Sequence, residues 1–326
     1  MTKEGLPMFE SYNLEGFGKR VRDLRHSLGY TQKEVHENTG IGLETIRRLE
    51  KGERLVKFDT LTYLSLFYKI DLLEELRSYN SANKLLKYYD KLDDVIVSYD
   101  YQKLMNLSND FKKYIGNDDE NTLELFKLNT INQFKVLVKG ITYLFSEEKD
   151  TNNLALDKFL NSLQITIPNF SLDNLKDHKY NIFEMRILLI IGITLNETEN
   201  HKKSNDILKF IITKLNFDKK AVYNEKKIII KTYFNISYNY NDLDNQEEAL
   251  KYANKGIEYC KANELIYNLN HLYYRKGIAE YLLGKDEDIY MDSLHKAIQV
   301  LEIQDQYELA NMYKGITADT YNLKIN

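Results

Sequence analysis

With 326 residues, 43% of them hydrophobic, the chain is too long for one core and apolar enough to fold, so we expect two domains or a repeat array. Proline breaks helix interiors, so the presence of only Pro7 and Pro168 favours a mostly helical protein, and the single Cys260 excludes an intramolecular disulfide framework. The net charge of −4 divides unevenly: residues 17–69 carry 11 Lys and Arg against 7 Asp and Glu, whereas the rest carries 34 against 42.

The first predicted helix begins near Phe17. Phe17, Val21, Leu24 and Leu28 follow one another at the spacing of a single apolar helical face. Gly29 comes next, at the position where glycine commonly caps a helix. The pattern predicts a short amphipathic helix that ends at this glycine.

Two further short helices follow. Thr31 and Glu34 have the spacing of a capping box, which predicts that the second helix begins after Thr31 and ends at Gly40. A third helix is predicted to begin around Gly42 or Leu43. This order of short helices with a tight glycine-containing turn is typical of a helix-turn-helix domain.

The third predicted helix has two distinct faces. Ile46 and Leu49 lie three residues apart and are expected to point inward. Glu44, Thr45 and Arg48 fall on a different, outward face. A helix of this kind offers polar side chains to an outside partner while its apolar side holds it to the domain.

The strings TQKEV, TGI, IRRLEKGER and TL, with their spacing, resemble the lambda-repressor-like or XRE family of helix-turn-helix domains, over roughly Phe17 to Leu73. The resemblance implies that the third helix enters the major groove of DNA. It assigns Gln32 to grip a phosphate, and it assigns groove-facing positions to Gly42, Leu43, Glu44, Thr45 and Arg48.

The chemistry of these residue types suits DNA contact. Arg48 suits a guanine, Glu44 a cytosine amine and Leu43 a thymine methyl group. Backbone phosphates are the expected partners of four more cations, which hold register without reading sequence: Lys33, Arg47, Lys51 and Arg54. For Lys51 and Arg54, ordinary solvated surface is an equal alternative.

Two positions have a structural interpretation. Arg25 and Glu50 match positions that the family commonly pairs as an internal salt bridge, so we expect both to support the fold. His36 stands where the family usually has a small residue, against the third helix. We expect this ring to be a tolerated neighbour of the core.

Beyond residue 70 the apolar spacing stays helical and small residues recur in similar settings. The recurring positions are Gly140, Gly192, Ser237, Gly277 and Gly315, and small residues also follow two of them after twelve residues, at Ser204 and Ala249. Paired helices that meet through small residues resemble tetratricopeptide repeats. The sequence therefore predicts an all-α chain: a helix-turn-helix domain at 14–73, a connecting helix with degenerate repeats at 74–130, and a right-handed superhelix of tetratricopeptide-like pairs at 131–326.

Repeat superhelices expose a concave surface lined by the first helix of each pair. If the small residues define one register, this surface includes Arg186, Lys231, Asn235, Tyr238, His271, Arg275 and Tyr281. Asn suits a peptide backbone, and Lys or Arg suits a carboxylate. Ordinary repeat surface is an equal alternative for each of them.

A lambda-repressor-like head followed by such repeats resembles the RRNPP group of peptide-sensing regulators of Gram-positive bacteria. The resemblance implies a homodimer that binds a double-stranded DNA operator through its heads and a short signalling peptide through its repeats. A second hypothesis is a DNA-anchored scaffold whose repeats bind a protein partner constitutively.

An enzyme is the least favoured class. The chain has no phosphate-binding glycine loop and no HExxH zinc pair, and its six histidines show no metal-ligand spacing. No cofactor or metal is therefore expected. The chain also has no apolar run of about 18 residues and no signal peptide, so we expect a cytoplasmic protein with no membrane partner.

Overall fold

The structure is a computed structural model that describes residues 12–54, 56–80, 87–92, 95–96, 100–115, 125–146, 148, 151–215 and 223–325. Throughout these residues every regular element is a helix, as expected. The chain divides into two compact units, residues 1–111 and 112–326. The segment expected to hold a connecting helix and degenerate repeats lies partly outside the described residues.

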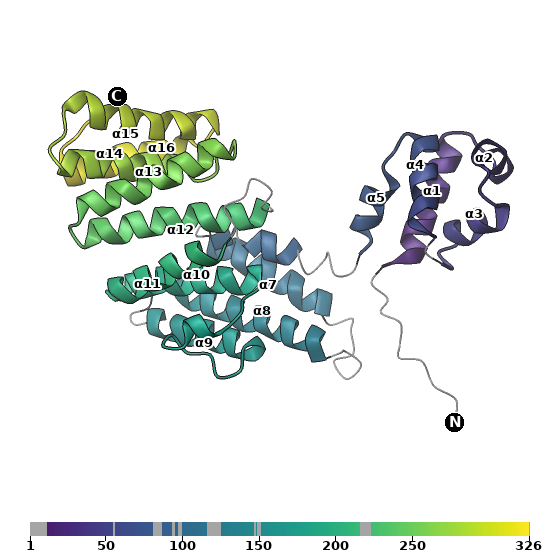
Figure 1. Cartoon of the computed structure of the whole chain (residues 1–326), viewed down its shortest axis with the longest axis horizontal. Helices are drawn as coiled ribbons and strands as arrows, with labels where there is room; N and C mark the ends of the chain where they lie inside the picture. The colour runs from purple at the N-terminus through teal and green to yellow at the C-terminus, as the bar shows by residue number, and fades with distance from the viewer. Residues whose placement is uncertain are drawn as a thin grey trace. The chain divides into compact units, whose positions relative to one another are not determined.

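The first unit contains a bundle of five short helices (Figure 1). They are α1 (Leu14–Ser27), α2 (Gln32–Thr39), α3 (Leu43–Glu50), α4 (Phe58–Tyr68) and α5 (Leu72–Ser78). Their apolar faces meet in one core, in which Phe17, Val21 and Leu24 of α1 pack with Ile46 and Leu49 of α3. The predicted inward face of the third helix is confirmed. That of the first helix is confirmed for Phe17, Val21 and Leu24, but Leu28 lies just past the end of α1 and is 44% exposed, so its assignment to this face was wrong.

The ends of α2 follow from two side chains and a glycine. The hydroxyl of Thr31 accepts a hydrogen bond from the Glu34 backbone N–H at 3.2 Å, and the Glu34 carboxylate accepts one from the Thr31 backbone N–H at 2.7 Å. This capping box satisfies two backbone donors at the helix start. Gly40 ends the helix with φ of 72°, a conformation that glycine adopts without strain. The predicted boundaries of α2 are confirmed.

The second unit consists of helix pairs that follow one another along the chain (Figure 1). The 15-residue helix α7 (Tyr101–Ile115) spans the boundary between the two units. The pairs are α8 (Leu125–Leu144) with α9 (Thr151–Thr166), α10 (Ile182–Glu197) with α11 (His201–Lys214), α12 (Tyr223–Asp242) with α13 (Gln246–Ala262), and α14 (Leu269–Leu282) with α15 (Glu287–Ile303). A short 3-10 helix, Leu175–Asp177, precedes α10, and α16 (Tyr307–Tyr321) follows the last pair.

The predicted small residues lie where the two helices of a pair meet. A Cβ atom built on Gly140 of α8 would lie 2.4 Å from the Phe159 ring of α9, and one on Gly277 of α14 would lie 2.7 Å from Leu294 of α15. Such distances exclude a larger side chain, so glycine sets the close approach of each pair. Gly315 of α16 has no described atom within 4 Å of that position, because no described helix covers this side of α16.

Hydroxyl groups reinforce two of these contacts. The Ser204 hydroxyl of α11 donates to the Gly192 carbonyl of α10 at 2.6 Å, and the Ser237 hydroxyl of α12 donates to the Ala249 carbonyl of α13 at 2.8 Å. All four residues were predicted from their twelve-residue spacing. The spacing therefore reflects a repeated contact between the first and second helix of a pair.

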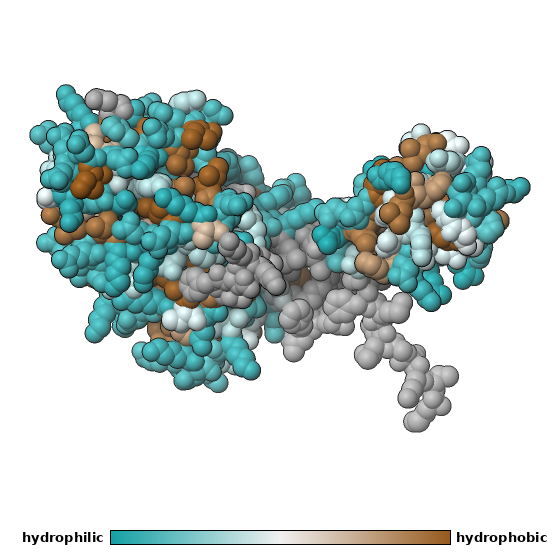
Figure 2. All heavy atoms as spheres, turned by 45° about the horizontal axis from the view of Figure 1, so that its top comes forward, coloured by the Kyte–Doolittle hydropathy of each residue, from teal (hydrophilic) through white to brown (hydrophobic). Residues whose placement is uncertain are grey.

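The surface is mainly hydrophilic on the face that Figure 2 shows, with apolar side chains among the polar ones. Among the described residues of the first unit, three large apolar side chains of α4 are the most exposed, at 60–66%: Phe58, Tyr63 and Leu66. Among the described helices, none combines the length and apolar character that crossing a membrane requires.

Candidate functional sites

The first candidate site is the polar face of α3. Ile46 and Leu49 are 1% and 2% exposed, which fixes the helix to its neighbours. Glu44 and Arg48 project from the opposite side, with side chains 57% and 50% exposed. Buried anchors and exposed polar groups on one short helix are the arrangement that places side chains in a DNA groove.

Ion pairs organise this polar face. The Glu44 carboxylate accepts hydrogen bonds from Arg47 Nε at 2.7 Å and from Arg48 Nε at 2.8 Å. The hydrogen bond from Arg47, which has the larger effect, and the one from Arg48 lower the pKa of Glu44 to about 2. Arg47 also pairs with Glu53 at 3.2 Å, and Lys51 lies 3.8 Å from the same carboxylate. Two carboxylates therefore partly neutralise three of the predicted DNA-contacting cations.

Gln32, the predicted phosphate-gripping residue, lies at the start of α2. Its Nε2 donates to the Glu50 carboxylate at 2.8 Å. The same carboxylate accepts hydrogen bonds from Arg25 at 2.6 and 2.8 Å, and both charged residues are buried. The predicted Arg25–Glu50 salt bridge is confirmed, and it joins α1, α2 and α3 through one carboxylate.

The other predicted DNA contacts surround this centre. Gly42 is the N-cap residue of α3, and Leu43 beside it is 44% exposed. Thr45 is half-buried, Arg54 is exposed, and Lys33 of α2 pairs with Glu37 at 3.5 Å with its side chain 77% exposed. His36 is half-buried, and its Nδ1 lies 2.8 Å from the Ile41 carbonyl oxygen in the turn between α2 and α3.

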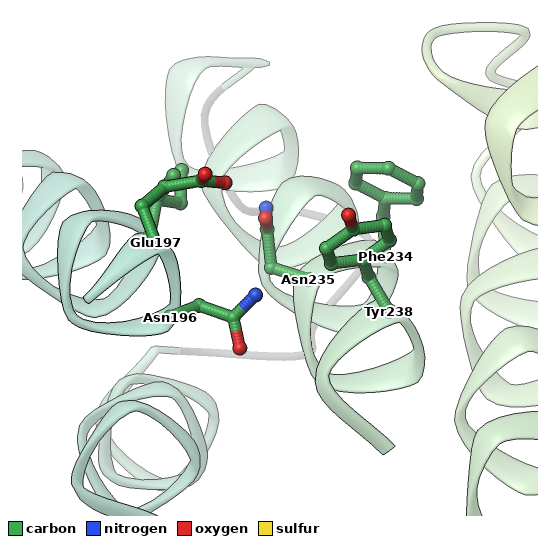
Figure 3. Close-up of a pocket in the computed structure, with 6 residues that line it drawn as sticks. Asn196, Glu197, Phe234, Asn235 and Tyr238 are labelled. Carbon is green, nitrogen blue, oxygen red and sulfur yellow. The ribbon is translucent and has the colours of Figure 1, made fainter. Parts of the chain in front are cut away.

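The second candidate site lies on the first helices of the repeat pairs. Helix α12 packs against both α10 and α14, and side chains of α14 contact α16. Between α10 and α12 is a cavity of about 160 Å³. It is lined by Ile193, Asn196 and Glu197 of α10 and by Phe234, Asn235 and Tyr238 of α12 (Figure 3).

Arg275 of α14 lies beside this cavity. Its guanidinium carbon is 4.5 Å from the centre of the Tyr238 ring and 5.4 Å from that of Tyr274. Its Nε is buried without a hydrogen-bond partner among the described atoms. Two aromatic rings thus hold a cation that retains unused hydrogen-bond donors.

His271, one turn before Arg275 on α14, packs against the Phe234 ring of α12 at 5.2 Å between ring centres. Its Nδ1 is hydrogen-bonded to the Tyr313 hydroxyl of α16. Burial, followed by the charges of Arg275 and Lys231, lowers the pKa of His271 to about 4. His271 is therefore neutral at pH 7.

The remaining predicted ligand contacts divide into two groups. Asn235 lines the cavity beside Tyr238 and donates to the Lys231 carbonyl at 2.8 Å, whereas the Lys231 ammonium lies 5.8 Å from the centre of the Tyr267 ring. The Tyr281 hydroxyl donates to the Tyr321 carbonyl at 3.3 Å, near the end of α16. Arg186 is only 6% exposed within α10, which differs from the expectation of a surface residue.

Four cavity residues were not predicted from the sequence: Ile193, Asn196, Glu197 and Phe234. Asn196 and Glu197 end α10 only four and five residues after the small Gly192, and Phe234 precedes Ser237 by three. The repeat register therefore contained the signal. The pairing of α10 with α12 across the cavity appears only in three dimensions.

Comparisons with known proteins agree with this architecture. Residues 17–77 match a family described as a helix-turn-helix domain. The HTH-type transcriptional regulator ImmR of Bacillus subtilis (strain 168) is 30% identical over 132 residues, which cover 39% of this chain and 92% of that protein.

Solved structures extend the likeness to the whole fold. PlcR of Bacillus thuringiensis in complex with the peptide PapR7 and DNA has a TM-score of 0.64 at 18% identity, covering 92% of this chain and 99% of PlcR. The pheromone receptor Rgg2 of Streptococcus dysgalactiae has a TM-score of 0.51 at 13% identity, covering 92% of this chain and 97% of Rgg2.

ComR of Streptococcus vestibularis, in complex with its signalling peptide XIP, has a TM-score of 0.50 at 12% identity, covering 94% of this chain and 98% of ComR. These three are RRNPP regulators, so the expected fold is confirmed. ImmR, by contrast, is similar in sequence, at 30% identity over 92% of its length. This chain belongs to the family of helix-turn-helix transcriptional regulators.

Proposed function

We propose that this regulator binds operator DNA through α3 and a short signalling peptide through its repeats, and that the peptide alters DNA binding. We call the peptide site the ligand groove: the cavity between α10 and α12 together with Arg275 of α14. The observation that carries the peptide half is Arg275, a cation stacked on Tyr238 at the wall of a cavity, with a buried Nε that has no partner among the described atoms.

The DNA half rests on the exposed face of α3. Arg48 offers the donors that a guanine accepts, and Glu44 offers an acceptor for a cytosine amine. Gln32 retains a free N–H after its bond to Glu50, which suits a phosphate oxygen. PlcR, which has a similar fold, was solved with a peptide and DNA bound together, and this supports the same two partners here.

We further propose a homodimer. A helix-turn-helix head reads one half-site, so two heads related by a two-fold axis read a palindromic operator. A peptide changes DNA affinity only if it binds one arrangement of the dimer more tightly than another. The ligand groove therefore needs to differ between the DNA-bound and DNA-free arrangements.

The test uses the purified full chain and synthetic peptides encoded by short reading frames next to its gene. An operator is first selected from random duplexes. We expect at least one peptide to raise the melting temperature and to change the operator affinity. If the chain selects an operator but no such peptide changes either quantity, the constitutive scaffold replaces the peptide-sensing regulator.

A further inference from the structure

The mouth of the cavity is acidic. Glu197 of α10 and Asp242 of α12 are both exposed there, and Asp242 accepts a hydrogen bond from the cavity residue Asn196 at 3.0 Å. Neither carboxylate has an ion pair within the described part of the chain. Partial desolvation at the mouth of the cavity, followed by the charge of Asp242, raises the pKa of Glu197. These two negative charges lack a positive partner.

The α14 side of the groove is basic. Arg275 stacks on the Tyr238 ring at 4.5 Å, and no ion pair to Arg275 occurs between the residues that the structure describes. The charges of Arg275 and Lys231 both act on His271, which places the two cations in one neighbourhood. This side of the groove therefore suits a negatively charged group, and a carboxylate matches the flat guanidinium best.

Tyr238 joins the acidic and basic sides. Its ring lines the cavity and supports Arg275, and the charges of Asp242, Arg275 and Glu197 all act on its hydroxyl. An extended peptide advances about 3.3 Å per residue. Groups that reach the cavity and the guanidinium together therefore come from residues no more than about two positions apart.

The cavity also limits what enters it. Its volume of about 160 Å³ is below the range of about 300–1,000 Å³ typical of sites for whole drug-sized ligands, so it receives a single side chain. Its walls combine the aromatic rings of Phe234 and Tyr238 with the amide of Asn235 (Figure 3). Aromatic walls below two carboxylates suit an ammonium or guanidinium group.

We propose that the peptide ligand carries a positively charged side chain within two residues of a carboxylate, with the positive group in the cavity beside Glu197 and the carboxylate on Arg275. This inference rests on the proposed peptide-binding function. The carboxylate belongs either to the C-terminus of the peptide or to an Asp or Glu side chain.

The probes are pools of hexapeptides, random except at fixed positions, tested for binding to the full chain by melting temperature and by competition. One pool has Lys or Arg in the second-last position and a free C-terminus. A second has Gln there instead, a third has Glu, and a fourth is the first with an amidated C-terminus. A fifth is amidated and has Asp or Glu next to the basic residue. We expect the first pool to bind at least tenfold more tightly than the second and third. If the C-terminus supplies the carboxylate, the fourth pool should bind more weakly than the first. If a side chain supplies it, the fifth pool should bind more tightly than the fourth.

Two variants tie this preference to the groove. Glu197 is exposed, so Glu197→Lys preserves the fold, and we expect it to shift preference from the basic pool to the Glu pool. Arg275→Gln is expected to remove the difference in affinity between the pool that supplies the carboxylate, which is the first or the fifth, and the amidated fourth pool. Arg275→Lys is expected to retain part of this difference. Glu258→Gln, an exposed glutamate on the second helix α13, is the matched control and should change nothing.

The outcomes separate the two proposals. If peptides bind without a charge preference, or Glu197→Lys keeps the preference of the native chain, the charge inference is overturned while peptide binding stands. If no pool binds, the proposed peptide function fails and the inference fails with it.

Discussion

Arg25 and Glu50 form a buried bidentate ion pair that links α1 to α3, with hydrogen bonds of 2.6 and 2.8 Å. Their side chains are 7% and 2% exposed. Arg25 also donates to the Tyr30 carbonyl at 2.7 Å, at the start of the turn that leads into α2. This pair positions α3, and hence the proposed DNA-reading face, relative to the rest of the first unit.

Arg25→Ala should destabilise the first unit by about 3–5 kcal/mol, because it leaves the Glu50 carboxylate buried without its cation. The measurement is hydrogen exchange of the α1 and α3 amides, or denaturant unfolding followed by helical circular dichroism. The matched control is Arg20→Ala, which removes a more exposed pair with Glu75 and should cost less than about 1 kcal/mol. Equal effects of the two variants would refute the structural role of Arg25.

Arg48→Ala should relax base preference at one position of each half-site and weaken operator binding by about 1–3 kcal/mol. Its side chain is half exposed and pairs with Glu44 on the surface of α3, so the fold should remain intact. The measurement is affinity for the selected operator and for random duplex. An equal loss on both would show that Arg48 contacts only phosphate.

Glu44→Gln should strengthen binding to random duplex several-fold. The Glu44 carboxylate pairs with Arg47 and Arg48, so its removal leaves more positive charge facing the phosphates. Affinity measured over a range of salt concentrations should fall more steeply for the variant than for the native chain. Weaker binding to random duplex at every salt concentration would contradict this electrostatic role.

Gly277→Ala and Gly315→Ala should have opposite effects, although both glycines lie in the same repeat register. A methyl group at Gly277 would meet Leu294, which should cost about 1–3 kcal/mol. At Gly315 no described neighbour lies within 4 Å, so the higher helix propensity of alanine should stabilise α16 by up to about 1 kcal/mol. Thermal unfolding checks both, and destabilisation by Gly315→Ala would show that α16 is covered in solution.

His271→Gln should make the repeat unit less sensitive to mild acid. The native pKa of His271, about 4, lies below its ordinary value near 6.5, so the unfolded chain binds more protons between these pH values. The contribution of neutral His271 to the free energy of unfolding is thus fully present above about pH 6.5. It is lost as the pH falls toward 4, by an amount on the order of 2 kcal/mol. Melting temperatures from pH 7 to 4 should fall more for the native chain than for the variant. Parallel curves would contradict the burial of a neutral His271 against Arg275 and Lys231.

Much of the first unit was predictable because its signals are local. The capping box of Thr31 and Glu34 and the glycines after α1, α2 and α3 are fixed by residues within one or two turns. The Arg25–Glu50 pair spans 25 residues, and it was predicted through family resemblance rather than through spacing. The ion pairs of Glu44 on α3 were not predicted, although their spacing of three and four residues is visible in the sequence.

The repeat unit was predictable in its register but not in its site. Gly192 and Ser237 correctly located the contacts within helix pairs, because a small residue is required wherever two helix backbones approach closely. The cavity and the stacking of Arg275 on Tyr238 depend on how neighbouring pairs pack, which involves residues 37 positions apart. The burial of Arg186 depends on the same packing.

Coupling between the ligand groove and α3 is tested most directly by measuring peptide affinity with and without the operator duplex. Binding free energies at two coupled sites are reciprocal, so the duplex should change peptide affinity by the same factor as the peptide changes operator affinity. We predict a change of about 5- to 150-fold, the usual range for such coupling. Identical peptide affinities in the presence and absence of saturating operator would contradict regulation of DNA binding by the peptide.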